Sequence, residues 1–517
     1  MTYRLLLAAT LAASLPSLPL AAQGGAPPAW ARGAVAQSEA DLQREYRQRR
    51  EALMARLPDG VLLALGASEP THDYLSFFQA PSFYYLTGFN EPGAALVMVK
   101  RGGSVSATMY VEPRVPAQEV WSGARLGAEA VARLTGMGAR SVEALRPALD
   151  SLLAARLPLY AVGEFGNEEG GDGAAAHTMT ADQQFVEALR ARHPNLRVQV
   201  ANEAVEQLRG TKSATELALI REAVDITVRA QNEAMRALEP GINEFELQAL
   251  IEYTFRRNGA DRPSFATIVG SGPNSTTLHH NEDNRFIEAN DIVVMDIGAS
   301  YKGYAADVTR TVPASGTFSP DQRAIYQLVR DAQAAAERQA KLGAPARLMS
   351  DSANVVLAGG LARLGLIESP SARYDCDFGG TRTECPQLML YYMHALGHGI
   401  GLEVHDPDQY YYSPGTIRPG SAFTIEPGIY VRANVLDVLP DTPRNRALAA
   451  RLRPAVERYR NIGVRIEDDY IATERGVEWI SRAPREINEV EAAMRGAFTG
   501  PAPRDPALVN AYRRVTP

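Results

Sequence analysis

Two aspartates in the stretch 291–311 lie where a buried pair of strands could hold them together. The stretch reads DIVVMDIGASYKGYAADVTRT, with Asp296 inside an apolar run and Asp307 in the run that returns. If the turn falls at Tyr301–Lys302, the two carboxylates face each other on neighbouring strands, roughly 5 Å apart. Facing carboxylates in apolar surroundings are destabilising unless a cation lies between them. The pair therefore predicts a cation site, although one turn aspartate and one exposed aspartate would fit the same pattern.

More ionisable residues lie in apolar, glycine-rich segments further along the chain. They are His279, His394, His398, His405, Glu426 and Glu467. His394 and His398 have the spacing of a zinc-protease pair on a helix. However, no Glu follows His394, and the glycines at 397, 399 and 401 disfavour a helix, so we predict an extended segment. Strand alternation places Arg465 and Glu467 on one face of their segment.

This set of residues has the composition of a metal site. Any one of these histidines or acids alone is more often structural than a ligand. Together, four carboxylates (Asp296, Asp307, Glu426 and Glu467) and one imidazole suit hard or borderline ions such as Mn²⁺, Co²⁺ or Zn²⁺. The carboxylates exceed what one ion needs, so a site for two ions is the natural interpretation.

The elements that must position these residues suggest two α/β parts. The N-terminal part alternates between helix and strand: a helix over 39–57, a strand over 60–66, and two strands within 83–100 joined by a turn at 90–93. After about residue 205 the pattern changes to long helices over 213–238 and 243–258. Strands that carry the acids and histidines follow, interrupted by helices over 321–341 and 350–364.

Length, charge and termini narrow the class of protein. The 517 residues are too many for one core, and the net charge of −7 gives no basic excess for nucleic acid or an anionic membrane. Residues 1–22 have the charge and apolar pattern of a cleaved signal peptide, so we expect an exported, soluble protein, periplasmic or secreted. An uncleaved anchor helix is the alternative, which Pro16 and Pro19 disfavour. Cys376 and Cys385 could form a local disulfide, although two free thiols would also fit.

At this point a family resemblance is clear. The acid and histidine segments resemble those of the pita-bread metallopeptidases, which include methionine aminopeptidase, Xaa-Pro aminopeptidase (aminopeptidase P) and prolidase. The stretches FYYLTGFNEPGAALV and KSATELALIREA are similar to the Xaa-Pro aminopeptidase branch. The resemblance covers most of residues 40–485. It implies an α/β two-domain fold with a creatinase-like domain over 38–205, a catalytic pita-bread domain over 212–485, and a tail over 492–517.

The resemblance also assigns roles, position by position. The metal ligands it implies are Asp296, Asp307, His398, Glu426 and Glu467. His279, His394 and His405 match the active-site histidines of the Xaa-Pro branch, Glu426 is the candidate proton shuttle, and Arg465 lies near a pocket for the proline ring. The implied cofactor is two divalent ions, Mn²⁺ first, with Co²⁺ or Zn²⁺ as alternatives.

The reaction implied by this resemblance is attack by a metal-bound hydroxide on the bond between the first residue of a peptide and a following proline. The implied substrates are peptides with proline in second position. Relatives with this N-terminal domain are commonly oligomers, so the resemblance also implies a homo-oligomer. Prolidase, restricted to dipeptides, is the alternative enzyme. A non-catalytic binding module and a creatinase-like amidinohydrolase without metal are further alternatives, which the complete ligand set disfavours. The segments around Cys376–Cys385 and 434–459 are longer than in compact bacterial members.

Overall fold

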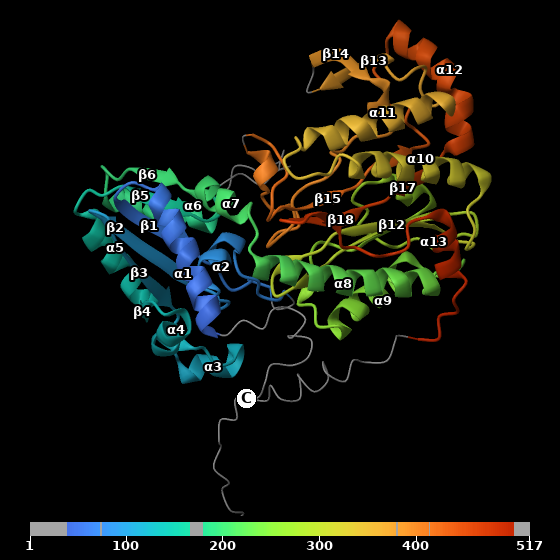
Figure 1. Cartoon of the computed structure of the whole chain (residues 1–517). Helices are drawn as coiled ribbons and strands as arrows, with labels where there is room; N and C mark the ends of the chain where they lie inside the picture. The colour runs from blue at the N-terminus through green and yellow to red at the C-terminus, as the bar shows by residue number, and fades with distance from the viewer. Residues whose placement is uncertain (1–38, 73–74, 166–178, 379–380, 413, 501–517) are drawn as a thin grey trace, which may run out of the picture.

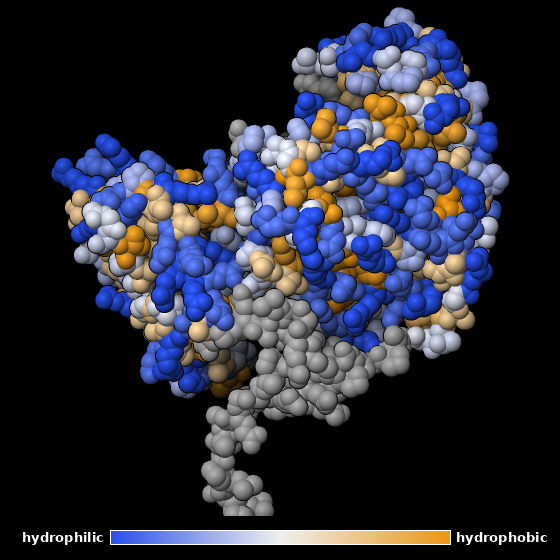
Figure 2. Space-filling view, in the orientation of Figure 1, coloured by the Kyte–Doolittle hydropathy of each residue, from blue (hydrophilic) through white to orange (hydrophobic). Residues whose placement is uncertain are grey.

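The computed structural model describes residues 39–72, 75–165, 179–378, 381–412 and 414–500. These residues form two α/β domains, one on the left and one on the right of Figure 1. The predicted signal peptide lies outside the described residues, as does most of the predicted tail. Within the described ranges, no helix is long and apolar enough to cross a bilayer. The face drawn in Figure 2 is mostly hydrophilic, with its apolar residues in small groups.

The N-terminal domain is built on a six-stranded mixed sheet with the strand order β4-β3-β2-β1-β5-β6. Its strands are β1 (Gly60–Leu65), β2 (Ala95–Arg101), β3 (Ser104–Val111), β4 (Gly138–Ser141), β5 (Leu159–Val162) and β6 (Val198–Val200). Its helices are α1 (Glu39–Arg56), α2 (Pro81–Thr87), α3 (Pro116–Ser122), α4 (Gly127–Thr135), α5 (Leu145–Leu153), α6 (Ala181–Arg192) and α7 (Asn202–Arg209).

Strand alternation divides the residues of β1 between two apolar cores. Val61 and Leu63 pack with the α5 leucines and with α6, whereas Leu62 and Ala64 face the opposite side of the sheet. The core on that opposite side is continuous with the core of the C-terminal domain. The N-terminal domain is therefore joined to the C-terminal domain by buried apolar surface.

The segment around Phe83 corrects one expectation. A strand was predicted there from its aromatic residues, but Pro81–Thr87 is the helix α2, and only the second predicted strand, β2, forms. Pro81 occupies the first turn, where its fixed φ suits a helix, and Gly88 ends the helix with a φ of 65°. These start and stop signals outweigh the strand preference of the aromatic residues.

The C-terminal domain places short sheets between two helix pairs, with α8 and α9 on one side and α10 and α11 on the other (Figure 1). Its helices are α8 (Ala214–Ala237), α9 (Glu244–Arg257), α10 (Pro320–Glu337), α11 (Arg347–Arg363), α12 (Pro443–Tyr459) and α13 (Ile487–Met494). Capping boxes at Ser213–Glu216, Asn243–Glu246 and Ser319–Gln322 begin α8, α9 and α10.

The strands of this domain carry most of the ionisable residues singled out above. They are β7 (Arg262–Pro263), β8 (Ile268–Ser271), β9 (Ile292–Ile297), β10 (Ala299–Tyr301), β11 (Tyr304–Ala305), β12 (Val308–Pro313), β13 (Arg373–Phe378), β14 (Thr381–Pro386), β15 (Ala422–Ile425), β16 (Gly428–Val431), β17 (Ile462–Arg465), β18 (Asp468–Thr473) and β19 (Gly476–Trp479). β9 lies between β12 and β8, β15 pairs with β18, and β16 pairs with β17.

The hairpin that carries the two aspartates closes one residue later than predicted. Its turn is Lys302–Gly303, with φ values of 49° and 84°, and Tyr301 pairs with Tyr304. A two-residue turn with both φ values positive is the type that matches strand twist, and Gly303 favours it. Asp296 therefore pairs with Thr309, and the prediction that Asp296 directly faces Asp307 is wrong.

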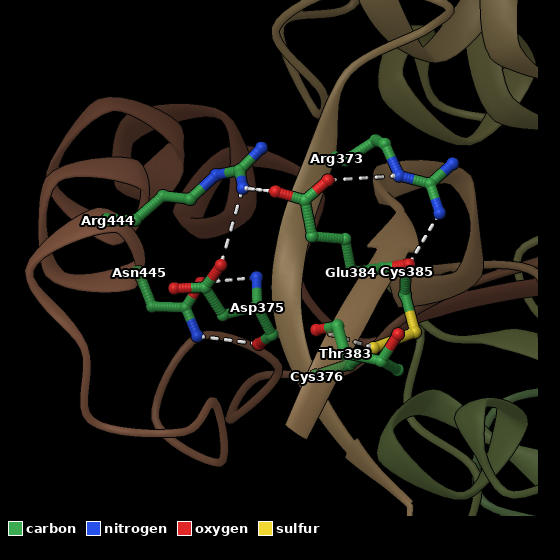
Figure 3. The surroundings of a disulfide bond; sticks show 8 residues. All are labelled: Arg373, Asp375, Cys376, Thr383, Glu384, Cys385, Arg444 and Asn445. Atoms are coloured by element: carbon green, nitrogen blue, oxygen red, sulfur yellow. Dashed lines mark hydrogen bonds and ion pairs between the residues drawn. A yellow bond between two sulfur atoms is a disulfide. The ribbon is translucent and has the colours of Figure 1, made fainter. Parts of the chain in front are cut away.

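The segments that looked extended relative to compact relatives form one unit at the edge of the domain. Cys376 and Cys385 are joined by a disulfide between β13 and β14 (Figure 3). Arg444 and Asn445, at the start of α12, contact Asp375 of this hairpin, and Arg444 also pairs with Glu384. The helix α12 lies within the segment 434–459 and thus holds the disulfide hairpin against the domain.

A buried cation, Arg310 of β12, joins this strand to β18 and to the segment after β19, and its contacts lead to a stability prediction. Its side chain is fully buried, pairs with Asp468 at 2.6 Å, and donates to the carbonyls of Glu467, Thr309 and Pro484. Because Arg310→Met removes one of the two arginines that pair with the fully buried Asp468 and takes the donor from the carbonyls of Glu467 and Pro484, we expect the free energy of unfolding to fall by about 3–5 kcal/mol. Urea denaturation followed by Trp479 fluorescence measures this change, since the Trp479 indole donates to Asp468.

The control for this prediction is Arg458→Met. Arg458 pairs with Asp321 at the surface, with 60% of its side chain exposed, so its loss costs under about 1 kcal/mol. Equal losses in the two variants would contradict the role given to Arg310.

Candidate metal centre

Five separate segments bring the predicted metal ligands to one place in the C-terminal domain. Asp296 lies in β9, Asp307 directly before β12, Glu426 directly after β15, and Glu467 directly before β18. His398 lies in a segment that is not helical, as predicted from its glycines, and it is not part of a strand either. All five side chains are at most 15% exposed.

Glycines let the His398 segment lie directly against its neighbours. A Cβ on Gly397 would lie 2.2 Å from the carbonyl oxygen of Thr424, and one on Gly399 would lie 2.3 Å from that of Asp406. In this close packing His398 accepts a backbone hydrogen bond from Thr424, and Leu396 accepts one from Glu426. Side chains at these glycine positions would push His398 away from Glu426.

The His398 ring points its unprotonated nitrogen at three carboxylates. Its Nδ1 lies 3.1 Å from the carbonyl oxygen of Gly399, which can only accept, so Nδ1 carries the proton of the neutral ring. Nε2 then faces Asp307 at 3.5 Å, Glu426 at 3.5 Å and Glu467 at 3.8 Å. Ligand atoms of Asp307, His398 and Glu467 lie within 4.8 Å of one another.

This arrangement fits a metal ion. A nitrogen lone pair and several carboxylate oxygens repel one another unless a cation lies between them. One oxygen each of Asp296, Asp307 and Glu467 is buried and has no hydrogen-bond partner among the described residues. Buried acceptors without partners are rare in proteins, and a metal ion satisfies them. The donor set of carboxylates and one imidazole suits Mn²⁺, Co²⁺ or Zn²⁺.

Asp296 is additionally held by a buried arginine. Arg465 donates to Asp296 at 2.5 Å and to the hydroxyl of Thr309 at 3.3 Å. The same hydroxyl donates to Glu467 at 2.6 Å. Both side chains thus meet Thr309, and the prediction that Arg465 and Glu467 share a face is confirmed. Arg465 is only 4% exposed, so it acts from behind the carboxylates.

A second hydrogen-bond chain fixes His394. Its Nδ1 lies 2.8 Å from the carbonyl oxygen of Ala395, which requires a proton there, and Nε2 accepts from the Tyr430 hydroxyl at 2.9 Å. The Tyr430 oxygen in turn accepts from Arg465 at 2.8 Å. Burial, and then the charge of Arg465, lower the pKa of His394 to about 4. His394 is therefore neutral at pH 7.

His405 and His279 are the exposed members of the set. The His405 ring lies 4.1 Å from the His398 ring, and its neighbour Asp406 is buried against Arg209 and Lys212. Arg209 also donates to Ser82 of the N-terminal domain, so the domain contact anchors the segment that carries His405. His279 follows Leu278, whose carbonyl accepts from Arg465.

The carboxylates of the cluster raise one another's pKa values. Burial, and then Asp296, raise the pKa of Glu467 to about 7. Burial, and then Glu467, raise the pKa values of Asp307 and Glu426 well above the usual range. Burial, and then the neighbouring His405, lower the pKa of His398 to about 4. The metal-free site therefore holds protons where a metal ion would place positive charge.

These shifts predict how the stability of chelator-treated protein depends on pH. Between pH 7.5 and 8.5 the unfolded chain has released its carboxyl protons and nearly all of its histidine protons, because an unperturbed histidine has a pKa of about 6.5, whereas the folded site still holds carboxyl protons. Stability therefore falls as pH rises, by about 1.4 kcal/mol per pH unit for each carboxyl group that remains protonated. Urea unfolding at pH 7.5, 8.0 and 8.5 measures this slope. Refilling with Mn²⁺ should flatten it, and a slope unchanged by metal would contradict the assignment.

Several residues that support the cluster were not singled out in the sequence. Thr309 and Asp469 each lie two positions after a carboxylate, and Tyr430 lies four after Glu426. Asp469 accepts the backbone N–H of Asp307 at 3.0 Å. The spacing of two was the available signal for Thr309 and Asp469, since alternate residues of a strand share a face.

The chain belongs to metallopeptidase family M24, whose family model matches residues 218–474. Residues 46–160 match the model of the aminopeptidase P N-terminal domain. This combination confirms the two-domain fold and the aminopeptidase P branch expected from the sequence.

Individual relatives and solved structures are also similar to this chain over most of its length. The chain is 34% identical over 457 residues to the Xaa-Pro aminopeptidase of Haemophilus influenzae, covering 87% of this chain and 97% of that protein. It is 32% identical over 468 residues to the Xaa-Pro aminopeptidase of Escherichia coli, covering 88% and 98%. Among solved structures, proline aminopeptidase P II from Yersinia pestis matches with a TM-score of 0.71 and 30% identity, covering 88% of this chain and 99% of that one.

Proposed function

We propose that this protein is an Xaa-Pro aminopeptidase, an exopeptidase that releases the first residue from peptides with proline in second position. The observation that carries the proposal is the His398 nitrogen directed at Asp307, Glu426 and Glu467 beside unpartnered carboxylate oxygens. The family supports the same chemistry. Names of relatives at about a third identity over nearly their whole length support the substrate class.

In this proposal Asp296, Asp307, His398, Glu426 and Glu467 hold two divalent ions, Mn²⁺ first, with Co²⁺ or Zn²⁺ as alternatives. When bound, such ions activate the attacking water and polarise the scissile carbonyl. The five side chains come from separate segments, so the rigid sheets around them set their positions. Arg465 and Thr309 hold Asp296 and Glu467 in place before any ion binds.

The remaining roles fall to ionisable groups that lie in or beside the ligand cluster. Glu426 carries a carboxyl whose pKa burial raises, and this suits proton transfer from the water to the leaving proline nitrogen. His405, beside His398, donates a hydrogen bond to the carbonyl oxygen as charge develops on it. The substrate's free amine lies near Asp296. His279, His394 and Arg465 line the side that selects the proline ring.

A prolidase is the alternative function, with the same chemistry but a strict need for a dipeptide. A binding module and a metal-free amidinohydrolase are disfavoured because all five ligand positions are filled by competent side chains. We further propose that the segment 1–22 directs export and that the mature enzyme is periplasmic or secreted. We also propose that it assembles into a homo-oligomer.

Substrate panels test the proposal. Chelator-stripped protein is refilled with Mn²⁺, Co²⁺ or Zn²⁺ and given Xaa-Pro-Yaa, Xaa-Ala-Yaa and Xaa-Pro peptides. Metal-dependent release of the first residue from Xaa-Pro-Yaa alone, or in preference to the others, is the expected result. Cleavage of Xaa-Pro dipeptides only would identify a prolidase, and no cleavage with any metal would support the binding module.

A further inference from the structure

A groove runs from His405, whose ring lies 4.1 Å from that of His398, toward the contact between the two domains. One hollow of about 320 Å³ has His405, Ser264 and Arg262 in its wall. A second, of about 290 Å³, has Phe78 of the N-terminal domain in its wall. The two hollows share the residues Pro81, Arg262, Ser300, Gly303 and Leu402. We call this continuous space the interdomain groove.

Arg262 is the cation common to both hollows. Its backbone is fixed because Arg262 of β7 pairs with Ser300 of β10. Its guanidinium lies over the Phe78 ring, 4.0 Å from the centroid, which restricts the side chain. Arg262 thus presents a fixed, planar set of donors at the middle of the groove.

Within the described part of the chain, no carboxylate lies within ion-pair distance of this guanidinium. Arg262 forms no ion pair with any other described residue, and burial lowers its pKa, with Asp261 as the only charge that opposes the shift. The Asp261 carboxylate instead accepts the backbone N–H of Gly303 at 3.0 Å. Glu403, also in the groove wall, pairs with Arg209. A partly buried arginine without an ion pair favours an incoming anion.

Charge and position together identify the occupant. The amine end of a peptide is cationic, and Arg262 repels it, whereas the carboxyl end is anionic. The groove opens beside His405, where the proposed function places the scissile carbonyl. Residues that follow the proline must leave the metal centre along some path, and this groove is open and carries the complementary charge.

We propose that Arg262 is a specificity-determining residue that binds a carboxylate of the substrate on the product side of the scissile bond. This inference rests on the proposed function and narrows its substrate class to peptides with an anionic group downstream of proline. The carboxylate comes from the peptide's C-terminus in short substrates or from an acidic side chain in longer ones. Phe78 holds the guanidinium in place for this contact.

The test compares peptides that differ only in this charge. Metal-loaded wild type, Arg262→Gln, Arg262→Lys and Arg256→Gln are given Xaa-Pro-Yaa peptides of three to five residues with a free or an amidated C-terminus. Amidated peptides with Glu or Gln after the proline separate the two sources of the carboxylate. Arg256 is the matched control, since it is an exposed arginine of α9 outside the groove.

Wild type should prefer the anionic member of a pair by roughly tenfold or more in kcat/KM. Arg262→Gln should lose this preference while it cleaves the amidated, uncharged peptide at the wild-type rate. Arg262→Lys should keep part of the preference, and Arg256→Gln should keep all of it. Equal rates of wild type on charged and uncharged peptides would overturn the role of Arg262 and leave the proposed function standing.

A binding measurement tests the role of Arg262 independently of turnover. Calorimetric titration of wild type and Arg262→Gln with the product-like peptide Pro-Yaa, as acid and as amide, measures the same charge preference at equilibrium. If no Xaa-Pro peptide is cleaved, the proposed function fails, and this titration still decides the role of Arg262. Equal affinity of wild type for acid and amide would overturn it.

Discussion

Asp307→Asn should lower kcat/KM on Xaa-Pro-Yaa peptides by more than about 100-fold, the upper end of what loss of a partner behind a metal ligand costs. The reason is local charge. Asp307 faces His398 at 3.5 Å and is one of the five proposed ligands, and a neutral amide would not supply the negative charge that divalent ions would need there. Bound metal, measured by elemental analysis, should fall with activity.

The fold should survive this substitution. The backbone N–H of Asp307 keeps its bond to Asp469, and removal of a carboxylate that its neighbours repel stabilises the metal-free protein above pH 7. The thermal unfolding midpoint of the chelator-stripped variant should therefore equal or exceed that of chelator-stripped wild type. Asp321→Asn, the same change at the surface beside Arg458, is the control and should leave activity unchanged. Normal turnover with normal metal content in Asp307→Asn would contradict the two-ion assignment.

Glu426→Gln should lower kcat by about 10²–10⁴-fold, the range expected for loss of a general acid–base group. The amide keeps the shape of the side chain and the backbone bond to Leu396, but it cannot accept and return a proton. The pH profile is the diagnostic measurement, since the residual activity should lose the limb that reports this carboxyl group.

Metal content separates the two roles proposed for Glu426. A variant that retains metal but loses kcat shows loss of proton transfer, whereas loss of both shows that metal binding depends on this side chain. Glu478→Gln, which breaks a surface pair with Arg221, should behave as wild type. Glu426→Gln with turnover within tenfold of wild type would refute the proton-transfer role.

The sequence predicted the candidate site better than it predicted the local backbone. The acids and histidines stand out because ionisable residues are costly in apolar segments, and the five proposed ligands do converge. The glycines beside His398 were also informative, because Gly397 approaches Thr424, and Gly399 approaches Asp406, too closely for a side chain. Both signals are encoded within a few neighbouring residues.

The errors arose where a neighbouring residue decides between similar patterns. A shift of one residue in the Lys302–Gly303 turn changed the partner of Asp296 from Asp307 to Thr309. Two end signals, Pro81 and Gly88, turned an aromatic segment into a helix. The link from Arg465 through Tyr430 to His394 joins segments that only the folded chain brings together, so no local pattern could reveal it.

The most direct test of the account is a titration of the metal-stripped protein with Mn²⁺ in which bound metal and turnover of an Xaa-Pro-Yaa tripeptide are measured in the same samples. We predict that activity is absent without metal, that two ions bind per chain, and that release of the first residue reaches its maximum as the site fills. Full activity in the stripped protein, or activity that bears no relation to bound metal, would contradict the assignment of this carboxylate and histidine cluster as the catalytic centre.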